Sequence, residues 1–128
     1  MIEKIYYKNI LIGIRIAGHF PKGSIPHTDE KEALGLLTLT YPAGSHLKAH
    51  VHKPKKRITH RLQECFIVHK GKARIDLYGP DKKLFKRIYI TTGQLFIALN
   101  GGHGFHILQD AEIIELKNGP FIDDKHFI

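Results

Sequence analysis

The sequence contains little sulfur and no tryptophan, with one cysteine and one methionine among 128 residues. Its single thiol, Cys65, cannot form a disulfide within the chain, which favours a reducing compartment. No apolar run approaches the roughly 18 residues that a membrane-spanning helix needs. The segment from Met1 to Ile5 does not resemble a secretory signal. We therefore expect a cytoplasmic protein with no membrane partner and a buried, unreactive Cys65.

Helical periodicity, internal repeats and low-complexity tracts are also missing. Short β-type runs are instead broken by Gly, Pro, Asn and Asp, which is typical of an all-β fold. The predicted strands are Leu11–Ile16, Leu34–Thr40, Leu47–His52, Cys65–Val68, Ala73–Leu77, Phe85–Ile90, Leu95–Leu99, Phe105–Leu108 and Ile113–Leu116. So many short strands favour a barrel or a jelly roll. The pattern predicts one domain over residues 1–128, with its core at roughly 34–117 and an N-terminal strand and loop at 1–33.

Positive charge is in excess, with 20 Lys and Arg residues against 12 Asp and Glu residues. The densest cluster runs from Lys53 to Arg57 and continues to Arg61. No aromatic side chains are interleaved with it, as base stacking would require, so we do not expect nucleic acid as a partner. Because the cluster directly follows His50 and His52, we expect it to attract a small anionic ligand such as a phosphate ester.

Histidine is abundant, with 10 residues, and its placement indicates a site. His50 and His52 are two apart and would project from the same face of a strand. His46 shares their parity. Glu64 begins the next predicted strand, and His103 follows a glycine-rich turn. We predict a metal site made by His50, His52, Glu64 and His103, because such a nitrogen and oxygen set suits a divalent transition metal such as Fe, Mn, Ni, Co, Cu or Zn.

Two assignments within this site stay open. His103 and His106 are alternatives for the fourth ligand, since residues an odd number apart on a regular strand point to opposite faces. If Glu64 binds the metal, a separate acid or base would have to come from the mouth of the barrel. The candidates for that catalytic role are His60, His69, His106 and Tyr78.

The spacing of these residues resembles the two motifs of the cupin superfamily. The matching positions are Gly44, His50, His52, Glu64 and Gly71 for the first motif, and the run from Gly93 to His103 for the second. The resemblance covers roughly residues 40–117 and implies an RmlC-like jelly-roll barrel, the double-stranded β-helix. The segment Lys53 to Gln63 is longer than the one the family has there, and substrate choice would be set in it.

A closer likeness involves the C-terminal side of the chain. The segments Gly102–Phe105, Ile113–Lys117 and Gly119–Phe121 look like the WbuC-type cupins, which are found among genes for surface-polysaccharide synthesis. This resemblance implies a metal-binding cupin that acts on a small oxygen-rich molecule such as a sugar or nucleotide-sugar. A metal-dependent isomerase, epimerase or dioxygenase would fit, and so would a ligand-binding or regulatory cupin without turnover.

A more distant likeness suggests chemistry without a metal. The segment from Ala49 to Lys53 is similar to the histidine segment of the cupin ketoisomerases of nucleotide-sugar pathways. By that resemblance His50 or His52 would act as acid and base. Small cupins commonly pair through their sheets, so we also expect a homodimer, with the strand Leu11–Ile16 as the edge to exchange.

Overall fold

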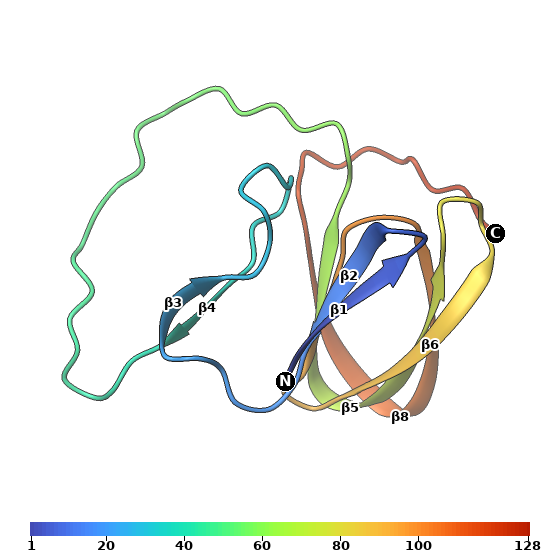
Figure 1. Ribbon diagram of the computed structural model, residues 1–128, viewed down its shortest axis with the longest axis horizontal. Coiled ribbons are helices and arrows are strands. Elements are labelled where there is room, and N and C mark those ends of the chain that lie inside the picture. Colours follow the sequence, from blue (N-terminus) through green and yellow to red (C-terminus); the bar gives the residue numbers. More distant parts are fainter.

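The computed structural model describes residues 1–128 and contains strands but no helix. The strands are β1 (Ile2–Tyr7), β2 (Ile10–Ile16), β3 (Gly23–Pro26), β4 (Leu37–Thr40), β5 (Glu64–Tyr78), β6 (Leu84–Thr91), β7 (Leu95–Ala98) and β8 (Gly102–Lys117). One sheet has the order β1-β2-β7-β5-β6, with β8 also paired to β5, and β3 and β4 form a separate hairpin. Figure 1 shows the larger sheet curled into a half-barrel, with the hairpin to one side. The structure thus offers no helix that could cross a membrane.

The longest strands, β5 and β8, run antiparallel and bend together near their middles (Figure 1). Their register shifts three times between Val68 and Ala73, which marks a bulged and strongly twisted stretch. Gly71 lies in this stretch at φ +92°, and a Cβ there would lie 2.1 Å from the Asp110 carbonyl oxygen. Only glycine fits such a close backbone approach at positive φ. The bend brings the two ends of β5 toward each other.

Strand alternation sorts the apolar residues of the sheet into two buried clusters. The inner cluster consists of Ile5, Phe66, Val68, Ala73, Ile75, Leu77, Ile88, Ile90, Phe96 and Ala98. The outer cluster consists of Ile14, Ile16, Cys65, Ile97 and Leu99, and Leu34 and Leu36 from the β3–β4 connection pack against it. The sheet that contains β5 therefore has a buried apolar cluster on each of its two faces.

The all-β prediction is confirmed, and several of its details are corrected. The runs at 65–68 and 73–77 are one strand, and so are those at 105–108 and 113–116, because the predicted turns are bends within β5 and β8. Strands β1 and β3 were not predicted. The predicted strand Leu47–His52 is wrong, because that segment is irregular and exposed. Strand β2 pairs with both β1 and β7, so it is not a free edge.

Candidate functional site

A carboxyl group and an imidazole meet on the inner face of the half-barrel. Glu64 Oε1 lies 3.5 Å from His103 Nε2, and both side chains are largely buried, with exposed fractions of 16% and 21%. In the ladder His103 is opposite Leu77, thirteen residues along β5 from Glu64. A straight strand of that length would span about 40 Å. The contact therefore depends on the bend that β5 and β8 share.

The strand ladder completes this group with two further side chains. Lys117 is directly opposite Glu64, and Glu115 is opposite Phe66, so all four project from one face. Lys117 Nζ lies 3.7 Å from Glu64 Oε2 and 3.3 Å from Glu115 Oε2. The Phe66 ring packs edge-on against the His103 ring at 5.1 Å between centroids. One ammonium, two carboxyls and one imidazole thus share a partly apolar setting.

A pocket of about 260 Å³ opens beside the Glu64–His103 pair. Its lining comes from the residues at and just before the start of β5, from the β5–β6 turn, and from the end of β7 through the β7–β8 turn to the start of β8: Arg61, Leu62, Glu64, Pro80, Ala98, Leu99, Asn100, Gly101 and His103. This volume lies just under the roughly 300 Å³ at which typical small-molecule sites begin. Arg61 lines the pocket, so a positive charge is available there to meet an anion.

Burial controls the protonation of Glu64. Loss of hydration raises the pKa of its carboxyl from 4.5 to about 7, and hydrogen bonding and repulsion from Glu115 add to this effect. Lys117 and Lys125 act in the opposite direction, because their positive charges favour the carboxylate. The proton shared within this pair lies mainly on Glu64, since the pKa of Glu115 is lowered by its hydrogen bond to Glu64. Glu64 is therefore a proton donor near neutral pH.

His103 is held in its neutral form by the same surroundings. Burial lowers the pKa of its imidazole below 6.5, and the positive charges of Lys117 and Lys125 lower it further, while Glu115 opposes them. At neutral pH the imidazole carries a free lone pair and can accept a proton. An acid and a base are thus adjacent in one pocket, which is the arrangement that general acid–base catalysis requires.

The metal prediction is wrong. His50 and His52 lie in the exposed segment between β4 and β5, with their rings 5.0 Å apart, and neither joins Glu64 or His103. No group of three or more His, Cys, Asp or Glu side chains lies close enough together to hold a metal ion. The physical reason is that the strand expected to carry His50 and His52 is not formed. The alternation of side chains along a strand therefore does not direct these two imidazoles toward Glu64 and His103. A divalent transition metal is therefore not supported as a cofactor.

The remaining histidine candidates do not line the pocket. His60, like His46, is exposed in the segment between β4 and β5. His69 Nε2 is 3.9 Å from a Glu112 carboxylate oxygen, on a side chain that is 71% exposed. His106 Nε2 lies 3.2 Å from Asp76 Oδ2 in an ion-pair cluster on another part of β5. The structure thus places His103, and not His106, beside Glu64.

Tyr78 ends β5 opposite Gly102, close to the β7–β8 turn that lines the pocket. Sequence reasoning did not single out Glu115, Lys117 or Arg61 as site residues. The signal for the first two was present, because Ile113, Glu115 and Lys117 alternate on one face of a strand whose apolar member packs on the core.

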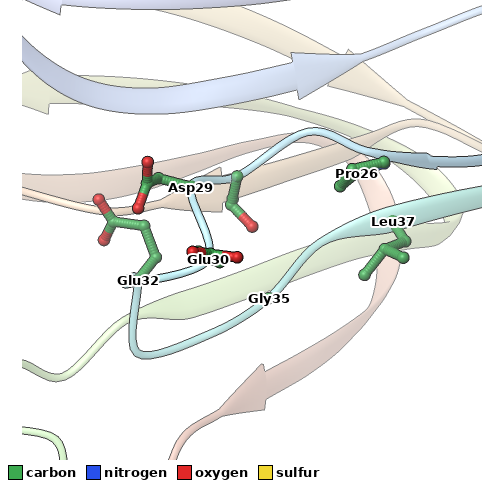
Figure 2. Close-up of a pocket in the computed structure, with 7 residues that line it drawn as sticks. Pro26, Asp29, Glu30, Glu32, Gly35 and Leu37 are labelled. Atoms are coloured by element: carbon green, nitrogen blue, oxygen red, sulfur yellow. The ribbon is translucent and has the colours of Figure 1, made fainter.

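A second pocket, of about 350 Å³, lies between β3 and β4 and carries three acidic side chains. Figure 2 shows Asp29, Glu30 and Glu32 along one loop, with Pro26 and Leu37 apart from them. Asp29 already accepts a hydrogen bond from the Lys31 N–H, and Glu32 accepts one from the Gln63 side-chain amide. These carboxylates stabilise the loop, and no chemistry is assigned to them.

Comparison of the chain with models of protein families, with curated proteins and with solved structures finds no match. The cupin and WbuC-type resemblance therefore rests on the motif residues alone. What the structure adds is an all-β, curled antiparallel half-barrel that is compatible with a jelly roll.

Proposed function

We propose that this chain is a cytoplasmic enzyme with a cupin-like jelly-roll barrel, in which Glu64 and His103 exchange protons with a small, anionic, oxygen-rich molecule such as a sugar or nucleotide-sugar. The contact that carries this proposal is the 3.5 Å approach of Glu64 Oε1 to His103 Nε2 at the wall of a pocket. It retains the isomerase alternative that the sequence left open, and it moves the acid and base from His50 and His52 to Glu64 and His103.

The reaction that best suits this pair is the interconversion of a hydroxy-aldehyde and a hydroxy-ketone. His103 Nε2 takes the proton from the carbon next to the carbonyl, while protonated Glu64 gives its proton to the carbonyl oxygen, which yields an enediol. His103 then returns a proton to the neighbouring carbon, and Glu64 takes one from the other hydroxyl group. Both side chains end the cycle in their starting states, so no further reactant is needed.

The protonation states of the pair support this assignment. The reaction needs Glu64 protonated and His103 neutral, and the pKa of about 7 at Glu64 lies above the lowered pKa of His103. Activity should therefore be greatest between these two values. It should decrease at higher pH as Glu64 loses its proton, and at lower pH as His103 gains one.

The test is deuterium exchange from heavy water into a panel of aldoses, ketoses and nucleotide-sugars, followed by NMR. We expect the wild-type protein to exchange the hydrogen next to the carbonyl of at least one compound. Glu64→Gln and His103→Asn should each reduce the rate by about 100-fold or more. His106→Asn is the matched control and should retain activity, because His106 contacts Asp76 outside the pocket.

Two results would count against the proposal. Exchange that persists in His103→Asn would show that His103 is not the base. Saturable binding of a nucleotide-sugar without any exchange would instead support the ligand-binding module that the sequence also allowed.

A further inference from the structure

The most unusual segment of the molecule is the connection between β4 and β5, residues 41–62, called here the arm. Every residue in it is exposed, and none belongs to a strand. Figure 1 shows it leaving the body of the molecule after β4 and returning at the start of β5. Between residues 46 and 58 its only hydrogen bonds join arm residues to one another, such as that between His50 and the Lys48 carbonyl. The backbone N–H groups of this stretch donate no hydrogen bond within the protein.

The sequence of the arm nevertheless has the pattern of a strand. Leu47, Ala49 and Val51 alternate with the polar residues of His46–His52, so an extended conformation would have one apolar and one basic face. Val51 is 90% exposed, although a branched apolar side chain favours a paired strand. A strand of this kind requires the edge of a sheet to pair with.

The body of the molecule has such an edge. Strand β8 is 16 residues long and pairs only with β5, so its other side presents unpaired backbone groups. Its two faces also differ in character near the C-terminal end. Ile114 and Leu116 are 49% and 51% exposed on the outer face, while Glu115 lies on the inner face. Long exposed edges of this type readily accept a further strand.

We propose that residues 46–52 of one copy of this chain add as a strand to the free edge of β8 in a second copy, and that the two copies exchange arms. In this arrangement the apolar face of the arm, with Leu47 and Val51, covers Ile114 and Leu116 of the partner sheet. The basic face then lies on the side of Glu115. The alternation of the arm and that of β8 therefore agree on both faces, and the backbone groups of both segments become paired.

Charge complementarity favours this partner. The arm carries six cations and no acidic residue: Lys48, Lys53, Lys55, Lys56, Arg57 and Arg61. Strand β8 carries Asp110, Glu112 and Glu115, with Lys117 as its only Lys or Arg residue. Attraction between the two segments would orient the copies as they meet, and it would weaken as salt is added.

The anchoring of the arm explains why a second copy, rather than the same sheet, is the expected partner. At its start the Tyr41 hydroxyl is 2.6 Å from Ser24 Oγ in the β3–β4 hairpin. At its end Asn118 donates hydrogen bonds to Thr59 Oγ1 and to the Arg61 carbonyl. Held at both ends, the arm loops outward on the side of the hairpin (Figure 1), where it would meet another molecule. Exchange of identical segments between protomers is a common route to dimers.

The test is sedimentation of the untagged full chain over a dilution series, combined with hydrogen exchange. We expect a dimer whose residues 46–52 exchange slowly. Val51→Lys should weaken the dimer by about tenfold or more, because a buried valine becomes a charge. Ile58→Lys is the matched control, since Ile58 is equally part of the arm but lies outside the paired segment, and it should leave the dimer unchanged.

Three results would overturn the inference. The first is a monomer at every concentration, with residues 46–52 exchanging rapidly. The second is a monomer in which those residues are protected, because the arm would then pair with its own sheet. The third is a dimer that Val51→Lys and Ile114→Lys leave intact, since the interface would lie elsewhere. None of these results depends on the proposed acid–base reaction, which is measured separately.

Discussion

Replacement of Glu64 by glutamine should make the protein more stable at neutral pH and should leave it nearly unchanged in acid. Glutamine has the size of a protonated glutamate and keeps a hydrogen-bond donor next to Glu115. Lys117 retains its contact with Glu115 at 3.3 Å, so the variant does not leave that ammonium without a partner. The substitution therefore removes mainly the ability of position 64 to become charged.

The magnitude follows from the pKa of Glu64, which burial raises from 4.5 to about 7. The folded protein holds this proton more tightly than the unfolded chain, so the contribution of Glu64 is fully present below 4.5 and is lost as the pH rises through 7. The interval corresponds to roughly 3 kcal/mol at about 1.4 kcal/mol for each pH unit. Above neutral pH, Glu64→Gln should therefore be more stable than the wild type by up to roughly 3 kcal/mol.

The assay is urea unfolding of both proteins at a series of pH values from acid to mildly alkaline, followed by circular dichroism. The difference in free energy of unfolding should be near zero below pH 4.5 and should increase to a plateau above about 7. A difference that stays constant with pH would refute the reasoning, because it would mean that the Glu64 carboxyl titrates normally. A variant that is less stable at every pH would show that contacts of the Glu64 carboxyl group that glutamine does not reproduce outweigh the effect of its charge.

Two further substitutions test the frame around the site. Asp76→Asn should destabilise the fold by about 2–3 kcal/mol at neutral pH, since this buried carboxylate accepts hydrogen bonds from Arg74 and Arg87. Because those two side chains lower the pKa of the Asp76 carboxyl below 3.8, the loss of stability should disappear in strong acid. Urea unfolding near neutrality and in acid would reveal both effects. Gly71→Ala should reduce the stability of the fold by about 1–3 kcal/mol, since its Cβ would collide with the Asp110 carbonyl at positive φ. Gly93→Ala is the control for conformational strain alone, because Gly93 is also at positive φ but lies in open space. Thermal unfolding is the measurement for both variants.

Much of the sheet could be predicted because alternation of apolar and polar residues follows directly from burying one face of a strand. The interior run Ala73, Ile75 and Leu77 is fully buried, as its pattern indicated. The bends could not be predicted in the same way. Gly71 and the polar pair Gln109–Asp110 indicate a change in chain direction. A turn and a bulge within a continuous strand nevertheless have similar local sequences, so the sequence alone does not tell them apart.

The candidate site shows a different limit. The motif spacing selected Glu64 and His103, which the structure brings together, but it also selected His50 and His52, which the structure does not. Parity arguments place side chains only where a strand is formed, and a strand is formed only where an edge pairs with it. Residues 47–52 have the alternation of a strand without a partner in one chain, so their local pattern could not establish where their side chains lie.

The pocket combines two groups whose effects on stability oppose each other. Burial keeps Glu64 protonated and His103 neutral, so the folded state resists losing one proton and resists gaining the other. Stability due to His103 increases as the pH rises toward 6.5, while that due to Glu64 decreases over an overlapping interval. Within the interval where both groups titrate, the stability of the wild-type protein should therefore depend on pH less steeply than that of either single variant. An uncharged acid and an uncharged base at 3.5 Å can coexist in a buried pocket where an ion pair would lose hydration. The same burial that keeps the pair uncharged leaves it ready to exchange protons with a bound substrate.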